Sequence, residues 1–531
     1  MESHLTMRIF LGLLNVINFM MFWIWSLIYR KQPSRIPPAK ETLFSLSATT
    51  LARMIRQREI TSYQVVYTYT ERIKEVNRVL NAVVDNRFGP AIIQAKICDE
   101  QLAAGKFDAE TLEKEKPLYG VPITIKECCA VKGLSYTGGS LIRKGIKATA
   151  DSAVIELLYN AGAIPLCVTN TPEMSSNFDT WNLVYGATLN PYDTRYSAGG
   201  SSGGEGALLG SGASLIGIGS DVAGSIRIPA IFNGVFGHKP TNGIISTRGH
   251  IPECKDETFQ RYLTFGPMTR YAEDLSLLMR VLASDCDRDL RLTVPVDLKQ
   301  LKVYYLQNVD NSFGILPVSP EIQQCVFKAA HHFEQLGLHT EKLPINWPAT
   351  IAEMGAASLL SMKEPPQILL SSDPKGRKNP AMELMKSLFC QPQYTKSAIF
   401  FSFLLESHFP FAKSSLSYYT KHAEVVRREL LNLLGDNGVF IYPTFRCPTT
   451  FRRLILLEFI NCSYATIFNV FGFPALHVPM GLNDEGLPIG VQVIAAPYQD
   501  RLCFAVAKEL ETAFGGWTPP PFSGADSRKR D

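Results

Sequence analysis

The sequence predicts an α/β protein built on a large, mixed, twisted sheet with helices on both faces, and one transmembrane helix before it. Short β-branched apolar runs such as residues 121–125 and 164–168 alternate with segments that have the apolar period of helices. A charge-free apolar segment, residues 9–29, precedes this alternation. The 531 residues are enough for a large buried core, and their apolar and charged fractions are those of a globular protein.

Charge and composition exclude several classes of function. A net charge of +4 is small for this length and indicates no nucleic-acid partner. Eleven cysteines without C-x-x-C spacing favour a reducing compartment over a disulfide framework. The nine histidines have no H-E-x-x-H spacing, so neither a metal nor another cofactor is expected.

The N-terminal segment is long enough to cross a membrane. After a tail of residues 1–8, residues 9–29 would span ~31 Å as a helix at ~1.5 Å per residue, against a hydrocarbon core of ~30 Å. A cleaved signal peptide is the alternative, but Arg30-Lys31 follows where a small-residue cleavage site would be needed. Lys and Arg are denser after the segment than before it, which predicts a single-pass protein with its main domain in the cytosol.

The remaining elements follow in order along the chain. Residues 30–45 contain several prolines and are predicted to be a linker, residues 46–517 the main domain, and residues 518–531 a disordered tail. Ser47 and Thr61 are predicted N-caps of the first two helices. The expected strands are residues 81–84, 121–125, 164–168, 215–219, 301–306, 439–442, 475–479 and 489–494, and the expected helices are residues 48–57, 62–76, 90–104, 152–161, 271–283, 320–336 and 500–514, with a further one after Ser225.

The stretch from Ser197 to Pro229 carries the strongest indication of chemistry. A glycine-serine loop, residues 199–204, is followed by a strand-like run and a second glycine turn, residues 221–225. Glycine lets backbone approach backbone or substrate closely, and two such turns can place Ser201 and Ser225 side by side. Serine hydroxyls beside exposed N–H groups indicate acyl transfer.

Three other interpretations of the glycine-serine loop are weaker. A flexible linker would not be followed at once by a buried strand. A phosphate-binding loop needs Gly-Lys-Ser/Thr at its end, where this loop continues Gly-Glu-Gly. The α/β-hydrolase elbow, G-x-S-x-G, fits residues 199–203 and would make Ser201 the nucleophile, but a polar turn precedes it instead of a strand.

Three motifs together closely resemble the signature of the amidase-signature family: GGSSGGE (residues 199–205), DVAGSIR (residues 221–227) and GVPITIKE (residues 120–127). The resemblance implies the fold of that family and a Ser–Ser–Lys triad, with Ser225 as nucleophile, Ser201 as proton relay and Lys126 as base. It also implies an oxyanion hole made by the N–H groups of Val222, Ala223, Gly224 and Ser225, and supporting roles for Ser202, Asp221 and Arg227.

The protonation state of Lys126 is central to this chemistry. The amine must be neutral to accept a proton, and burial without a carboxylate partner lowers the pKa of a lysine. Glu127 is expected on the opposite face of the strand. Cys128 and Cys129 are interpreted as buried structural thiols, and the mechanism requires no histidine.

Within the family, the N-terminal apolar segment and the ending Phe514-Gly515-Gly516-Trp517 are most similar to fatty-acid amide hydrolases of type 2. This implies a membrane-anchored serine hydrolase that cleaves fatty-acid amides to free fatty acid and amine through an acyl-enzyme. The implied partners are a lipid amide and a membrane, that of the endoplasmic reticulum or of lipid droplets; a homodimer is left open.

Residues 363–430 interrupt the alternation of strands and helices. In related hydrolases such helices shape the acyl pocket or face the membrane; ordinary core is the alternative.

Three alternative functions stay open. One is hydrolysis of another small amide, and a second is a glutaminase-type amidotransferase subunit with the same signature. The third is a non-catalytic lipid-binding relative. Ala223 raises that last possibility because the family usually has glycine there, and alanine disfavours a positive φ.

Overall fold

The computed structural model describes residues 33–521, except 310–313, 346–349, 372, 374–375, 377, 390–391 and 410, together with eight single positions between residues 13 and 27. The expected tail, most of the expected transmembrane segment 9–29, and residues 522–531 lie outside the described residues. Within the described part of the chain, none of the helices combines the length and the apolarity that crossing a membrane requires.

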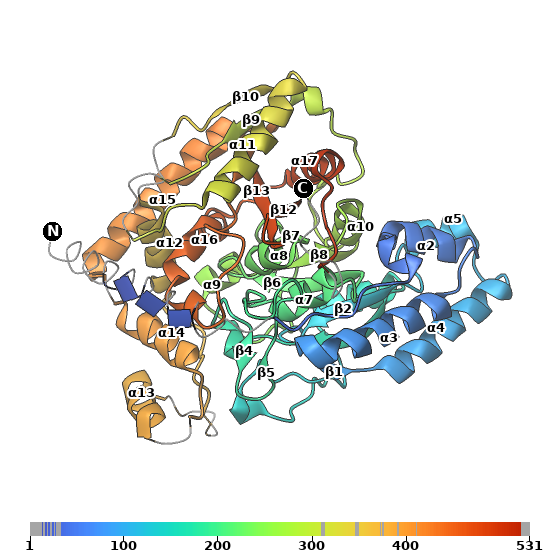
Figure 1. Cartoon of the computed structure of the whole chain (residues 1–531), viewed down its shortest axis with the longest axis horizontal. Coiled ribbons are helices and arrows are strands. Elements are labelled where there is room, and N and C mark those ends of the chain that lie inside the picture. The colour runs from blue at the N-terminus through green and yellow to red at the C-terminus, as the bar shows by residue number, and fades with distance from the viewer. Residues whose placement is uncertain are drawn as a thin grey trace.

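An eleven-stranded mixed sheet forms the centre of the molecule, with strand order β1-β3-β2-β6-β8-β7-β12-β13-β11-β9-β10 (Figure 1). The pairs β3–β2 and β2–β6 are parallel, as are β11–β9 and β9–β10, while the strands between them pair antiparallel. The strands of this sheet are β1 (Val83–Asn86), β2 (Pro122–Lys126), β3 (Ile164–Thr169), β6 (Ile216–Asp221), β7 (Phe236–Lys239), β8 (Thr264–Thr269), β9 (Lys302–Tyr305), β10 (His339–Lys342), β11 (Gly438–Tyr442), β12 (Ala475–Leu482) and β13 (Pro488–Ala495); β4 (Trp181–Asn182) and β5 (Gly186–Ala187) form a separate pair.

The helices pack around this sheet (Figure 1). In chain order they are α2 (Ala48–Arg56), α3 (Ser62–Leu80), α4 (Phe88–Ala103), α5 (Ala109–Glu115), α6 (Ala153–Asn160), α7 (Gly203–Gly210), α8 (Arg227–Asn233), α9 (Glu257–Tyr262), α10 (Glu273–Leu282), α11 (Pro320–Gln335), α12 (Ile351–Leu360), α13 (Pro380–Phe389), α14 (Lys396–Ser407), α15 (Lys413–Leu434), α16 (Ser463–Phe471) and α17 (Asp500–Phe514).

Both faces of the sheet are buried, as the sequence predicted. Successive residues of a strand point to opposite faces. On β11, Val439 and Ile441 join the apolar cluster that includes α3, α10 and α17. Phe440 and Tyr442 join a second cluster, which includes α12, α15 and α16. Two apolar layers therefore enclose the sheet, and the predicted mixed α/β architecture is confirmed.

The predicted helix starts have a local cause that the structure shows. The Ser47 side chain accepts a hydrogen bond from the N–H of Thr50. Thr61 and Gln64 form a reciprocal capping box at the start of α3. Such caps satisfy N–H groups that the helix itself cannot pair.

Two central strands, β7 and β8, were not among the predicted ones. Gly266 and Pro267 lie within β8, and both residue types weaken a strand pattern. The structure needs glycine at position 266, because a Cβ there would lie only 2.1 Å from the carbonyl oxygen of His238 on β7. The close approach of β7 and β8 therefore requires a glycine, and this glycine weakens the strand pattern by which the sequence could have predicted β8.

The segment predicted as a linker is packed against the main domain from residue 33 onward. Ile36 is buried, and the N–H of Ser34 donates to Thr194 Oγ1 at 3.0 Å. Arg72 donates to the carbonyl oxygen of Pro37 at 2.8 Å. At the other end, Tyr192 donates to the carbonyl oxygen of Thr518 at 2.6 Å, so the first residue of the predicted tail contacts the domain.

Candidate active site

Parallel pairing of β2 with β6 brings two distant parts of the chain to one edge of the sheet. Thr124 pairs with Gly217 and Ile125 with Ile218. The strands therefore end together, with Lys126 on β2 beside Ser220 and Asp221 on β6. The turn after β6 leads into α8, and the glycine-serine loop leads into α7. All three predicted motifs meet at this edge.

Lys126 is held between two serine hydroxyls. Its Nζ lies 2.6 Å from Ser201 Oγ and 3.0 Å from Ser220 Oγ. The side chain is fully buried, and no carboxylate of the described residues pairs with it. Burial lowers the pKa of Lys126 below its ordinary value because a charged amine loses its hydration there. The arrangement favours the neutral amine that a base requires.

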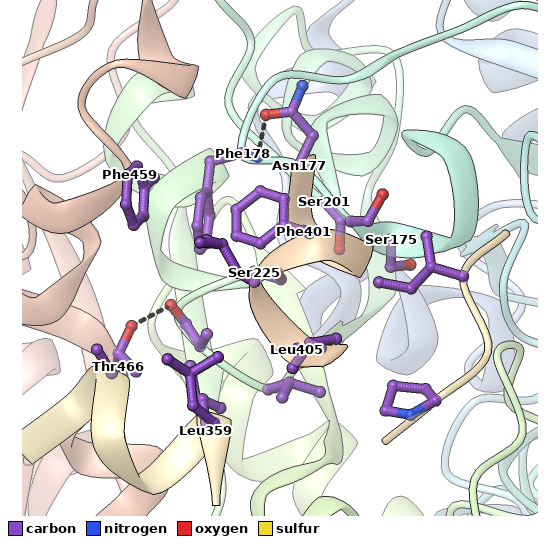
Figure 2. A pocket seen from close by; sticks show the side chains of 18 of the residues that line it. Ser175, Asn177, Phe178, Ser201, Ser225, Leu359, Phe401, Leu405, Phe459 and Thr466 are labelled. Carbon is purple, nitrogen blue, oxygen red and sulfur yellow. Dashed lines mark hydrogen bonds between the residues drawn. The ribbon is translucent and has the colours of Figure 1, made fainter. Parts of the chain in front are cut away.

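Ser201 and Ser225 both line one pocket (Figure 2). Ser201 is fully buried, follows a cis Gly200–Ser201 peptide, and its carbonyl oxygen accepts a hydrogen bond from Thr171 at 3.1 Å. Ser225 is 8% exposed, and its hydroxyl makes no hydrogen bond within the described chain. Its carbonyl oxygen accepts from the N–H of Ser202 at 3.1 Å. Lys126 is therefore hydrogen-bonded to Ser201, while the Ser225 hydroxyl is free toward the pocket.

Ser202, for which the sequence predicted a supporting role, contacts β6. Its hydroxyl donates to the carbonyl oxygen of Ser220 and accepts from the N–H of the same residue, both at 3.4 Å. Together with the bond to Ser225, these contacts fasten the glycine-serine loop to β6 and to the second turn. Ser202 thus supports both turns without entering the pocket.

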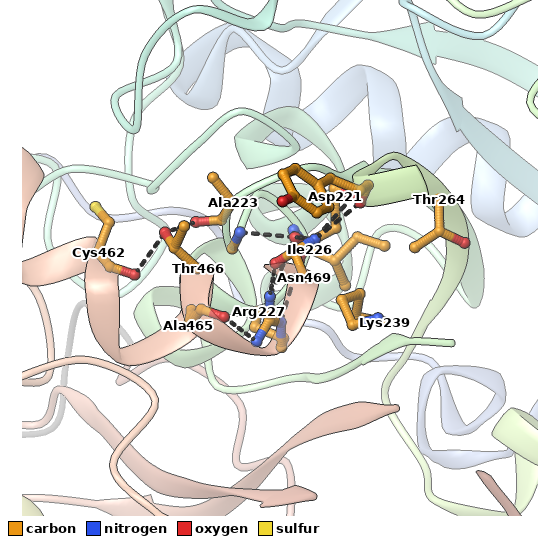
Figure 3. A network of polar contacts seen from close by, with 12 residues as sticks. Asp221, Ala223, Ile226, Arg227, Lys239, Thr264, Cys462, Ala465, Thr466 and Asn469 are labelled. Carbon is orange, nitrogen blue, oxygen red and sulfur yellow. Dashed lines mark hydrogen bonds and ion pairs between the residues drawn. The ribbon is translucent and has the colours of Figure 1, made fainter. Parts of the chain in front are cut away.

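A buried ion pair holds the second turn in shape (Figure 3). Arg227 and Asp221 lie 3.2 Å apart, and both side chains are fully buried. Burial by itself would raise the pKa of Asp221, but the Arg227 guanidinium outweighs this effect and the pKa is lowered to about 2. The Asp221 carboxylate accepts from the N–H groups of Gly224 at 2.6 Å and Ile226 at 3.0 Å. Arg227 also donates to Asn469 Oδ1 at 2.6 Å. The two charged residues therefore shape the backbone and do not line the pocket.

This geometry changes the expected set of oxyanion donors. The N–H of Gly224 points to Asp221 and is engaged there. Within the described chain the N–H groups of Val222, Ala223 and Ser225 have no partner, and all three residues line the pocket. Three of the four predicted donors are thus available to a ligand.

Ala223 fits the turn without strain. It is not among the residues with positive φ, whereas Gly224 has a φ of 110°. A Cβ on Gly224 would lie 2.8 Å from the Cβ of Ala465, so glycine is required at position 224. Alanine at position 223 is therefore compatible with the backbone conformation of the turn, which was the doubt that the sequence raised about this residue.

The pocket beside Ser225 has a volume of about 210 Å³, and no Asp, Glu, Lys or Arg is found among the described residues that line it. Most of its lining residues are apolar, and many of them lie on helices outside the three motifs. Figure 2 shows Phe178, Leu359, Phe401, Leu405 and Phe459 around the two serines. Phe401 and Leu405 belong to α14, inside the segment 363–430 that interrupts the predicted alternation.

Sequence reasoning missed two residues at the inner end of the site, Ser220 and His250. Ser220 lies at hydrogen-bond distance from Lys126, from Cys128 Sγ at 3.4 Å, and from His250 Nε2 at 3.1 Å. Both Ser220 and His250 line the pocket. Ser220 directly precedes Asp221 at the end of a strand, a position that could have marked it. No pattern in the sequence links His250 to this strand.

The two acidic residues nearest Lys126 in the motifs have structural partners. Glu127 accepts from the N–H groups of Thr137 and Gly138 at 2.6 and 2.8 Å, away from the lysine, as its strand position predicted. Glu205 accepts from Thr124 and Thr169 at 2.6 and 2.7 Å. Burial raises the pKa of Glu205 to about 8, which keeps this carboxyl largely protonated at neutral pH.

The described residues contain no cluster of three His, Cys, Asp or Glu side chains that could hold a metal ion. The polar groups around Lys126, as described, are hydroxyls, one imidazole, one thiol and backbone N–H groups.

Comparison with known proteins identifies the relatives of this chain. Residues 64–504 match the family model described as Amidase. Fatty-acid amide hydrolase 2 of Homo sapiens is 37% identical over 98% of this chain and 99% of its own length. Fatty-acid amide hydrolase 2-A of Danio rerio is 38% identical over 96% of this chain and 97% of its own length. Among solved structures, a fatty acid amide hydrolase shares the fold with a TM-score of 0.71, at 22% identity over 89% of this chain and 86% of that one.

Proposed function

The chain belongs to the amidase family and is an amide-hydrolysing enzyme; from this premise we propose that it cleaves fatty-acid amides to a free fatty acid and an amine through a Ser–Ser–Lys triad. A single observation carries the proposal: the free hydroxyl of Ser225 lies in an apolar pocket that also contains Ser201, which in turn lies 2.6 Å from the buried amine of Lys126.

In the proposed mechanism, Ser225 Oγ attacks the amide carbonyl carbon. Its proton passes to Ser201 Oγ while Ser201 gives its own proton to Lys126 Nζ. The N–H groups of Val222, Ala223 and Ser225 would stabilise the developing negative charge on the carbonyl oxygen. The proton then returns from Lys126 through Ser201 to the leaving nitrogen, and the carbon–nitrogen bond breaks. Water would later hydrolyse the Ser225 ester by the same proton path.

The substrate class follows from the walls of the pocket. A small polar amide such as the side chain of glutamine needs hydrogen-bonding partners when it is buried. Apart from several serines, Asn177, His250 and Thr466, the described wall is apolar; phenylalanine, leucine and methionine are its largest side chains, and it has no charged residue. Burial of an acyl chain there contributes about 0.8 kcal/mol per CH₂ group. The pocket thus favours long acyl amides over glutamine or short amides.

We further propose that residues 9–29 anchor the enzyme in a membrane, of the endoplasmic reticulum or of lipid droplets, with the main domain in the cytosol. The apolar length of this segment supports the anchor, and the basic residues that follow it support the orientation. On α13, the side chains of Met382, Met385 and Phe389 are exposed. Exposed apolar side chains on a helix next to α14, which lines the pocket, suit delivery of a lipid from a bilayer.

Labelling with a fluorophosphonate probe, which reacts with activated serines, tests the enzymatic proposal. We expect the wild type to be labelled at Ser225 and Ser225→Ala to remain unlabelled with its fold intact. Octadecanamide should compete with the probe far better than acetamide does. Label on Ser201 in the Ser225→Ala variant would overturn the assignment of the nucleophile, and equal competition by both amides would overturn the lipid substrate.

Removal of residues 1–30 tests the anchor separately. The contacts of Ser34 and Pro37 with the domain remain in this variant. We expect turnover of soluble substrates to stay near that of the wild type while flotation with phospholipid vesicles decreases. Unchanged flotation would contradict an anchoring role for this segment.

A further inference from the structure

The hydroxyl of Ser220 has three polar neighbours but only one hydrogen to donate. It lies 3.0 Å from Lys126 Nζ, 3.1 Å from His250 Nε2 and 3.4 Å from Cys128 Sγ. A serine hydroxyl has one hydrogen to donate and two lone pairs that accept. If all three contacts are hydrogen bonds, one neighbour must accept and the other two must donate.

The other ring nitrogen of His250 decides which neighbour accepts. His250 Nδ1 lies 3.3 Å from the carbonyl oxygen of Pro252, and a carbonyl oxygen only accepts. Nδ1 therefore carries the hydrogen, and in a neutral imidazole Nε2 is then an acceptor. With the ring neutral, the Ser220 hydroxyl therefore donates to Nε2, and its oxygen accepts from the amine of Lys126.

The ring is held firmly in this position. His250 is 3% exposed, and its segment pairs by a β-bridge with Cys129, three residues after Lys126. The N–H of Ile251 donates to the carbonyl oxygen of Cys128 at 2.9 Å. Phe265 of β8 packs edge-on against the ring, with centroids 5.5 Å apart. Backbone pairing and ring packing together keep Nε2 directed at Ser220.

We propose that His250, acting through Ser220, orients the amine of Lys126 for catalysis. With the Ser220 hydrogen committed to His250, Lys126 directs one N–H at Ser220 Oγ and keeps its lone pair for the hydroxyl of Ser201. Without His250, the Ser220 hydroxyl is free to donate to that lone pair and block it. His250 is thus a positioning residue, outside the three residues that transfer the proton, and this inference rests on the proposed function.

Two substitutions of His250 separate this role from simple packing. His250→Phe keeps a ring against Phe265 but removes the acceptor, while His250→Gln keeps an acceptor oxygen near the position of Nε2. For octadecanamide hydrolysis by the full-length protein, we expect His250→Phe to lower kcat by ~3- to 10-fold, the rate equivalent of one net hydrogen bond. We expect His250→Gln to stay within ~2-fold of the wild type.

A double-mutant cycle with Ser220→Ala shows whether the effect passes through Ser220. In the Ser220→Ala background His250→Phe should have no further effect on kcat, because the hydroxyl that it controls is absent. A loss of equal size in both backgrounds would overturn the proposal, as would full activity of His250→Phe or a loss in His250→Gln as large as that in His250→Phe.

A measurement that needs no activity keeps this inference distinct from the proposed function. In full-length protein with ¹⁵N-labelled histidine, the His250 signal, identified by its absence from His250→Gln, should show a protonated Nδ1 and an unprotonated Nε2. A hydrogen on Nε2, whether or not Nδ1 also carries one, would overturn the orientation proposed for Ser220. Absence of all labelling and hydrolysis in the wild type, beside the expected tautomer, would instead count against the proposed function.

Discussion

The side-chain nitrogen of Lys126 and the side-chain oxygen of Ser201 lie 2.6 Å apart, although the two residues are separated by 75 positions in the chain. Both side chains are fully buried. A buried amine without a carboxylate partner is held closer to neutrality than a lysine in water. We therefore expect this pair to determine how the rate of hydrolysis responds to substitution of Lys126 and to the pH of the solution.

Lys126→Ala should damage amide hydrolysis more than ester hydrolysis. An amine leaving group must be protonated before it departs, whereas an alkoxide needs protonation far less. Loss of the proton carrier should therefore reduce the rate of amide hydrolysis more than that of ester hydrolysis. We expect kcat/KM to decrease ~10²- to 10⁴-fold for an acyl amide and clearly less for the matched acyl ester. Parallel assays of the two substrates check this. An equal decrease in kcat/KM for the amide and the ester would show that Lys126 does not protonate the leaving group.

The rate of the wild type should increase with pH through an apparent pKa below the ordinary 10.5 of lysine. Only the neutral amine accepts a proton, so activity is lost as the pH falls through the pKa of Lys126. Desolvation lowers that pKa, and negative charge on Cys128 raises it. Cys128→Ala should therefore move the increase in rate to lower pH.

Cys167→Ala is the matched control for this shift. Cys167 is a buried thiol on the neighbouring strand β3, and it is not among the groups with the largest effects on the pKa of Lys126. We expect its pH–rate profile to coincide with that of the wild type. A profile that moves equally in both variants would mean that general loosening of the core, and not the charge of Cys128, causes the shift.

Adjacent positions of the second turn should respond in opposite ways to substitution. Ala223→Gly removes a methyl group at a position with ordinary backbone geometry, so we expect probe labelling within ~3-fold of the wild type and a loss of stability of ~0.5–1 kcal/mol. Gly224→Ala should abolish labelling because φ is 110° and the new Cβ would collide with Ala465. Labelling and urea unfolding of both variants test this. Strong activation by Ala223→Gly would show that alanine impairs the oxyanion hole after all.

Arg227→Ala should destabilise the protein by ~3–5 kcal/mol, because it leaves the Asp221 carboxylate buried without its counter-charge. Urea unfolding at neutral pH measures the change. The control is Lys114→Ala, which breaks an exposed pair with Glu110 whose two side chains are 71% and 80% exposed. That variant should stay within ~0.5 kcal/mol of the wild type, since exposed pairs contribute little. A similar small effect for Arg227→Ala would show that the turn does not depend on the buried pair.

Local backbone requirements made much of the site readable from the sequence alone. The glycines of the two turns, the end of β2 at Lys126 and the N-caps of α2 and α3 all depend on residues close in sequence. The apolar runs of β2, β3 and β6 likewise predicted buried strands, because a strand enclosed on both faces needs apolar residues throughout. The motif residues Lys126, Ser201 and Ser225 do lie at one edge of the sheet, where their motifs placed them together.

The tertiary structure alone decided what surrounds these residues. The conformation of Ala223 depends on the contacts of the whole turn, and the engagement of the Gly224 N–H depends on where Arg227 holds Asp221. His250 reaches Ser220 because its segment pairs with the chain after β2, while α14 brings Phe401 to the pocket from about 200 residues further along the chain than Ser201. Periodicity and spacing report which face of an element is buried, but they do not report which elements become neighbours. The order β3-β2-β6-β8 is set by packing over the whole domain, and that order determines which side chains face the two serines.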